Sequence, residues 1–544
     1  MDSILQKFLS KTKGILPESL FKTLPSLFNI CLLAIVFLLL NWWYRDLTEI
    51  SSSDFSNFVM VKEPQQYFSS QSISLYILLL LLVLTVFRYK LLLTKWRDLF
   101  GGNFVRAVIG CCAVMLCWIH VSYPHLYFID ESVILERICI AVLTGLVLWR
   151  PFFLIPFLLY PIIFHFGEPF LVNNWSVTEM PMRLLILFGA QLILFLIVGK
   201  LRWDIGAFIF LLFGVLMGNY FPAGLGKLLL GWLSRYHLYL FLPGMYADGW
   251  MGFLSEETIS QTTRFLAKFN MPFKVIAILL EFGCIFFLIR KVKSITFFLI
   301  GFVLFHFVVF LLTGIGFLPW VLVELILLYG FYKKNVLHKV VKNYTKWHII
   351  LSIFMVVGSP VWLMCSVYAW YESPINYVYE FEVEDEFGDT SYVPTELFWP
   401  KYFEFHRYNF HYLRNKQTLN ISWVTVGEKE LLHDLITSKS AEEIFAVEHK
   451  YGGNKFNQNL SSDFDTYFSK FINDRDTYKL RKNPWLTGIS APPQRISMNN
   501  KDNLYQGNTK IVKLTIHQKL SYFDGETYQI IRERPVYYLN INSE

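Results

Sequence analysis

The sequence contains little charge and few cysteines, and it lacks several familiar catalytic motifs. Only 17% of its 544 residues are charged, whereas an average soluble protein has about 25%. All seven cysteines lie in or beside apolar stretches, and none follows Cys365, so no disulfide framework holds the C-terminal part. Cys111, Cys112 and Cys117 lie in one apolar run, which favours apolar packing over a metal site. The sequence has no Gly-rich phosphate loop, nucleophile elbow or HExxH motif.

Long apolar runs dominate the first two-thirds of the chain. Hydrophobic residues make up 54% of the sequence, with 52 Phe and 16 Trp. A helix needs about 20 apolar residues to cross a bilayer core. We therefore predict a polytopic α-helical membrane domain over residues 1–370, with about eleven transmembrane helices near 27–43, 72–88, 104–120, 133–149, 151–166, 182–199, 204–224, 272–290, 294–312, 316–332 and 347–369.

Basic and non-basic loops alternate between these runs. The N-terminus carries Lys7, Lys11, Lys13 and Lys22, and a later basic segment runs from Lys333 to Lys346. The positive-inside rule predicts a cytoplasmic N-terminus and an extracytoplasmic C-terminal domain, in a plasma, inner or endoplasmic reticulum membrane. The net charge of +7 is distributed among these loops, so we expect the lipid bilayer as a partner and no nucleic acid.

The remaining residues, 371–544, predict a small α+β domain. Residues 377–383 and 417–426 have the composition of strands, with turn residues at Gly388 and Asp389. Two alternating segments, 509–517 and 526–541, flank Asp524-Gly525, which is a strong hairpin signal. Residues 428–449 and 462–474 have helical patterns.

Four ionisable residues in or beside the apolar runs stand out: Lys227, Glu281, His306 and Glu324. An ionisable group inside a membrane is costly and is a functional candidate by default. A Lys near a helix end can instead extend its amine to the interface, and Glu or His can serve in helix packing. A Lys in an apolar pocket has a lowered pKa and suits proton abstraction from a weakly acidic apolar substrate.

The segment 219–243, NYFPAGLGKLLLGWLSRYHLYLFLP, resembles a known signature. The vitamin K-dependent gamma-carboxylases and the related horizontally transferred transmembrane family show an aromatic pair, a small-Gly step, Lys-Leu and then Trp. The matching positions here are Tyr220, Phe221, Ala223, Gly224, Lys227, Leu228 and Trp232. Glu281 in an apolar helix and His306 followed by Ile315-Gly316 also resemble the family order. The resemblance covers roughly residues 100–410.

The resemblance implies a quinol-dependent carboxylase and epoxidase, a carbon–carbon lyase acting on glutamate of a secreted peptide or protein. In the carboxylases, the Lys deprotonates vitamin K hydroquinone; oxygen converts the anion into a strong base, and carbon dioxide adds to the resulting Glu carbanion. Reduced vitamin K or menaquinol is the implied cofactor, a lipid quinone the implied partner, and no metal is expected. The implied catalytic residues are Lys227, Glu281 and His306, and the implied cofactor contacts are Tyr220, Phe221, Gly224 and Trp232.

Two other readings stay open. The chain could be a non-catalytic family member that serves in peptide or protein export, maturation or resistance, with Lys227 structural. The loop before the sixth span reads Asn173-Asn174-Trp175, where family members have Asn-His. A transporter is disfavoured, because the sequence lacks paired Gly/Pro-broken helices in two similar halves.

Overall fold

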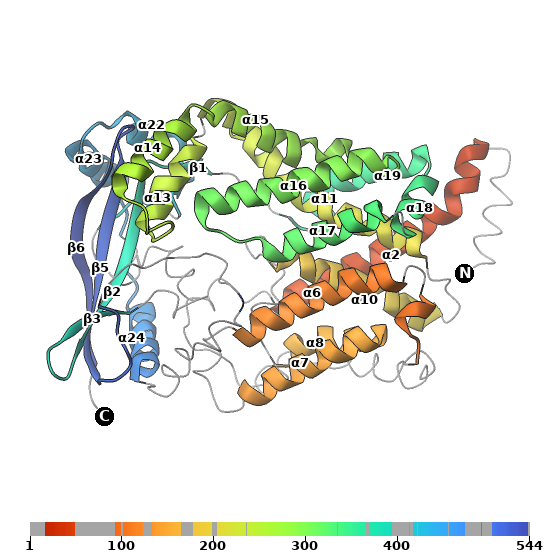
Figure 1. The fold of residues 1–544 in the computed structure, drawn as a ribbon, viewed down its shortest axis with the longest axis horizontal. Helices are drawn as coiled ribbons and strands as arrows, with labels where there is room; N and C mark the ends of the chain where they lie inside the picture. Colours follow the sequence, from red (N-terminus) through yellow and green to blue (C-terminus); the bar gives the residue numbers. More distant parts are fainter. Residues whose placement is uncertain are drawn as a thin grey trace.

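The protein divides into a bundle of apolar helices and a sheet domain at one end of it. The computed structural model describes residues 17–48, 93–99, 102–122, 133–164, 178–198, 204–235, 237–333, 336–365, 370–393, 413, 417–421, 423–454, 456–473, 491 and 503–541 (Figure 1). The long helices lie roughly along the longest axis of the molecule, and the strands stand across one end of the bundle.

Within the described ranges, five helices are long and apolar enough to cross a membrane: α2 (Glu18–Thr48), α6 (Gly102–Ser122), α10 (Glu179–Val198), α11 (Ile205–Leu229) and α16 (Val292–Thr313). Shorter apolar helices pack beside them: α7 (Val133–Trp149), α8 (Leu154–Phe164), α17 (Leu318–Tyr332) and α19 (Lys346–Val357). The helical membrane class follows from these elements.

The count of about eleven spans is not confirmed. The predicted run 272–290 forms the short helix α15 (Asn270–Glu281) and the 3₁₀ turn η5 (Gly283–Phe286) in place of one continuous helix. The run 347–369 breaks at Gly358, after which α20 (Ser359–Trp362) begins. Pro360 fits in the first turn of α20, because N–H groups there have no hydrogen-bond partner within the helix. The predicted run 72–88 lies outside the described residues.

The sheet domain contains a four-stranded antiparallel sheet in the order β3-β2-β5-β6. Its strands are β2 (Ile375–Asp385), β3 (Thr390–Val393), β5 (Ile511–Phe523) and β6 (Tyr528–Asn540). These strands confirm the predicted strand at 377–383, the turn at Gly388 and Asp389, and the hairpin at Asp524-Gly525. Gly525 has φ +102°, a left-handed conformation that glycine adopts without steric cost.

The two faces of strand β2 have different partners. Phe381 and Val383 are buried against helices that include α24 (Gln458–Asn473), whose predicted existence is confirmed. On the opposite face, Glu380 lies 3.0 Å from the Lys519 amine, and Glu384 lies 3.1 Å from the Lys513 amine. The alternation of period two therefore separates an apolar core face from a charged face.

One prediction for the sheet domain was wrong, and one that is confirmed divides into two elements. The predicted strand 417–426 contains only β4 (Thr425–Val426) and an isolated bridge at Thr418. The predicted helix 428–449 is two helices, α22 (Lys429–Thr437) and α23 (Ala441–Tyr451). They separate because the Ser440 side chain accepts a hydrogen bond from the Glu443 N–H and caps α23.

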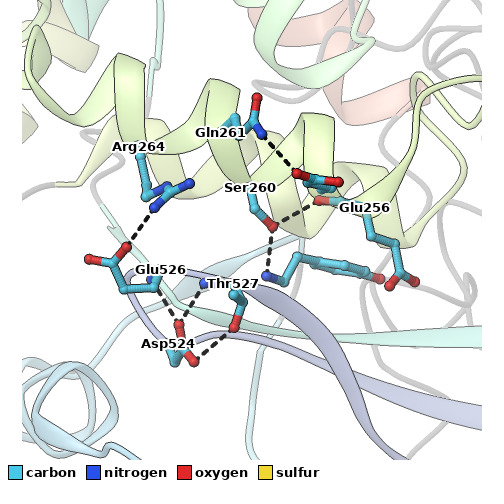
Figure 2. Close-up of polar contacts among 9 residues, drawn as sticks. Glu256, Ser260, Gln261, Arg264, Asp524, Glu526 and Thr527 are labelled. Carbon is cyan, nitrogen blue, oxygen red and sulfur yellow. Dashed lines mark hydrogen bonds and ion pairs between the residues drawn. The ribbon is translucent and has the colours of Figure 1, made fainter.

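The helices α13 (Phe241–Ala247) and α14 (Glu256–Ala267) join the bundle to the sheet. Figure 2 shows α14 lying over the turn between β5 and β6, where the Ser260 hydroxyl accepts a hydrogen bond from the Tyr528 N–H at 2.9 Å. The Asp524 carboxylate accepts bonds from the backbone N–H groups of Glu526 and Thr527 and closes the turn. Arg264 lies 2.9 Å from the Glu526 carboxylate. The hairpin is thereby fixed to the helical part.

Candidate functional site

Helix α11 carries the candidate site because its sequence is apolar for five turns and then introduces a cation. Asp204 caps its N-terminus by accepting a bond from the Ala207 N–H at 3.0 Å. The helix contains Pro222 near its end and ends at Leu229, two residues before Gly231, which has φ +70°. Lys227 lies in the last turn, where the helix dipole favours a positive charge.

Lys227 forms an ion pair with Glu281, the last residue of α15. The Lys227 side chain is 16% exposed and the Glu281 side chain 5%. The Lys227 amine also lies 5.3 Å from the centre of the Trp232 ring, within the range of a cation–π interaction. The amine therefore contacts a carboxylate and lies near an aromatic face, and both residues are among those that the sequence named for the site.

The pair depends on the close approach of α11 and α15 at Gly224. A Cβ atom at this position would lie 2.8 Å from the carbonyl carbon of Glu281 and from the Cα of Phe282. Phe221, one turn earlier, stacks on Phe282 with ring centres 5.5 Å apart. Gly224 and Phe221 thus help to set the position of Glu281 against Lys227.

The sheet domain covers the segment that follows Lys227. Trp232 is 1% exposed and belongs to the same core as Tyr371 of β1 (Tyr371–Glu372). The Glu372 carboxylate accepts a bond from the His237 N–H at 3.2 Å, and the Lys274 amine donates to the Leu233 carbonyl at 2.6 Å. Residues of two elements thereby fix the 230–238 segment.

Glu372 is a buried acid with an altered ionisation. Burial raises the pKa of its carboxyl from an ordinary 4.5 to about 8. The His237 N–H and the positive charges of Lys227 and Lys274 oppose this shift without cancelling it. Burial also lowers the pKa of the nearby His237 imidazole. Both shifts favour neutral groups at this junction.

A second polar group lies on α11, two turns before Lys227. The Tyr220 hydroxyl is 2.6 Å from His306 Nε2 on α16 and 2.5 Å from Glu324 Oε1 on α17. We call these three residues the Tyr220 array. All three side chains are buried.

The predicted site residues therefore fall into two groups. Lys227, Glu281, Gly224, Phe221 and Trp232 come together at the ends of α11 and α15. The other two predicted residues, Tyr220 and His306, instead bond to each other, with Glu324 completing that group. The Asn173-Asn174-Trp175 loop lies outside the described residues.

The sequence reasoning missed Glu372 and a buried ion pair between Glu179 and Arg183, 2.6 Å apart on α10. The Arg183 guanidinium also donates to Asn219 of α11 at 2.5 Å and to the Leu363 carbonyl at 2.9 Å. The sequence does contain a signal for this ion pair, because a Glu and an Arg four residues apart in an apolar run are neighbours on a helix. Nothing near Glu372 in sequence indicates its burial.

No group of three or more His, Cys, Asp or Glu side chains in the described ranges could hold a metal ion. Comparison with known proteins found no matching family model, no similar curated protein and no similar solved structure.

Proposed function

We propose that this chain is a quinol-dependent membrane enzyme of the gamma-carboxylase kind, in which Lys227 removes a proton from a quinol hydroxyl. The observation that carries the proposal is the partly buried Lys227–Glu281 pair beside Trp232, at the end of an apolar helix. The signature residues of the resemblance supply most of this group. Carboxylation of a peptide or protein glutamate would be the reaction that follows from quinol deprotonation.

Glu281 gives Lys227 a route to the neutral amine that a base must have. The two groups are hydrogen-bonded, so moving one proton from the ammonium to the carboxylate converts an ion pair into an amine and an acid. A low-dielectric site favours the neutral form because charges are poorly solvated there. The amine lone pair then accepts one proton from the quinol hydroxyl, and Lys227 becomes an ammonium.

The surroundings suit a lipid-soluble substrate. Phe221 and Trp232 present aromatic surfaces close to the pair, and both are buried. A site that excludes water strengthens the electrostatic contacts within it and protects a strong base from protonation by solvent. The amine is oriented toward Glu281 by the close packing at Gly224.

A non-catalytic role has one specific observation in its favour. The Lys227 amine already has a partner within the chain, so the pair could serve only to join α11 to α15. A membrane factor for peptide or protein export, maturation or resistance would need no more than that. A measurement of quinol-dependent carboxylation distinguishes the enzyme from the non-catalytic membrane factor.

The test is incorporation of labelled carbon dioxide into Glu-containing peptides by purified protein with reduced vitamin K or menaquinol. We expect incorporation by wild type and none by Lys227→Met. Lys268→Met, which removes an exposed lysine at the end of α14, is the matched control and should keep full activity. The enzyme proposal fails if wild type shows neither incorporation nor quinone epoxidation with either quinol.

A further inference from the structure

The Tyr220 array has two open ends. His306 Nδ1 and Glu324 Oε2 are both buried, and neither has a hydrogen-bond partner among the residues that the structure describes. A buried polar atom without a partner costs free energy, and native structures keep few of them. Both open atoms belong to one three-residue network, at its two extremes. Helix packing alone does not require such an arrangement.

The direction of the bond to His306 follows from that of the bond to Glu324. The Tyr220 hydroxyl donates its single hydrogen to Glu324 Oε1, so it must accept at its oxygen from His306. His306 therefore carries its hydrogen on Nε2, 2.6 Å from the Tyr220 oxygen. Its Nδ1 atom is left with a free lone pair. The array begins with a proton acceptor at His306.

Aromatic rings enclose the array. The Tyr220 ring stacks on Phe302 with centres 3.6 Å apart, and the His306 ring stacks on Phe317 at 4.6 Å. Trp320 meets the Tyr220 ring edge-on at 5.5 Å. Such an apolar enclosure penalises an isolated charge, so Glu324 is held as a neutral acid with its proton on Oε2. The array ends with a proton donor at Glu324.

We propose that Tyr220, His306 and Glu324 form a proton relay inside the helical bundle. A water molecule that reaches the bundle gives a proton to His306 Nδ1 while the Nε2 proton moves to the Tyr220 oxygen and the phenolic proton moves to Glu324 Oε1. The proton on Glu324 Oε2 leaves to a second water molecule in the same transfer, so no isolated charge stays in the apolar enclosure. One proton enters, one leaves, and no group is oxidised or reduced. The relay is independent of the quinol chemistry proposed for Lys227, because it requires only proton transfer along existing hydrogen bonds.

Infrared spectroscopy of the full chain in nanodiscs tests the relay without any activity assay. The carbonyl stretch of the Glu324 acid is identified as the band that Glu324→Gln removes. On transfer to heavy water this band shifts as the acid exchanges its proton for deuterium. We expect Tyr220→Phe to slow this exchange by roughly tenfold or more, which corresponds to at least ~1.4 kcal/mol of added barrier.

Phe302→Leu is the matched control, since it removes the ring stacked on Tyr220 but no group that carries a proton. Its exchange should be no slower than that of wild type. Equal exchange rates in wild type and Tyr220→Phe would overturn the relay. Absence of a Glu324 acid band in wild type would also overturn it, and this outcome needs no folded variant beyond Glu324→Gln.

Discussion

Helix α11 carries two buried polar groups that lie two turns apart and differ in kind. The Lys227–Glu281 pair is closed, because each charge has the other as its partner and the sheet domain covers the segment beside it. The Tyr220 array is open, because an atom at each of its ends has no partner in the described part of the chain. The two proposals assign different tasks to these groups: removal of one substrate proton at the Lys227–Glu281 pair, and passage of protons along the neutral Tyr220 array.

The largest expected effect comes from Gly224→Ala, which disturbs the Lys227–Glu281 pair and leaves the Tyr220 array unchanged. The new Cβ would lie 2.8 Å from backbone atoms of Glu281 and Phe282, which have little room to yield. We expect α15 to shift away from α11 and the free energy of unfolding to fall by about 3 kcal/mol. Thermal unfolding of the purified protein in detergent measures this change.

Gly214→Ala on the same helix is its control. A Cβ there would have its nearest neighbour, a Trp362 ring atom, at 3.8 Å, an ordinary contact. The expected change is within about 0.5 kcal/mol. Equal destabilisation by both substitutions would show that the closeness of α11 and α15 at Gly224 has no special importance.

The next effect compares single and paired removal of charge. Lys227→Met leaves the Glu281 carboxylate buried without its partner and should lower the free energy of unfolding by about 2 kcal/mol. Lys227→Met with Glu281→Leu should recover most of that loss. Tyr220→Phe, which removes only neutral hydrogen bonds, should cost about 1 kcal/mol. A double variant no more stable than Lys227→Met would contradict the closed pair.

The last expected effect concerns the junction with the sheet domain. Between pH 4.5 and about pH 8 the folded protein holds a proton on Glu372 that the unfolded chain releases. The contribution of Glu372 to stability therefore falls as the pH rises through this window. Glu372→Gln has no carboxyl group to titrate, so this pH-dependent loss of stability should be absent. The thermal midpoint of the variant, relative to that of wild type, should therefore rise from pH 5 to pH 8.5. Parallel curves for the two proteins would rule out a shifted Glu372.

The sequence predicted elements with a strong local signal and failed where distant contacts decide. Asp524-Gly525 between alternating segments identified the β5–β6 hairpin, since turn chemistry and period two are local. The break after Glu281 was missed, because hydropathy continues through it while the backbone ends its helix. Glu372 was missed because its burial arises from packing of the sheet domain on the 230–238 segment.

The site shows the same limit. Lys227, Glu281 and His306 were recognisable as ionisable groups in apolar runs. Their division into two separate groups was not recognisable. Tyr220 and Lys227 are seven residues apart on one predicted helix, so we expected them to share one site. The structure separates them by partner: Glu281 at the end of α15 for Lys227, and Glu324 on α17 for Tyr220.

The measurement that bears most directly on the role of Lys227 is the absorption spectrum of a quinol bound without oxygen. Purified wild type and Lys227→Met would each be titrated anaerobically with menaquinol in nanodiscs. If Lys227 is the base, wild type should bind the quinol with the spectrum of the deprotonated anion, and Lys227→Met should show only the neutral quinol. Identical neutral spectra, or no quinol binding to wild type, would contradict the assignment of Lys227 as a quinol base.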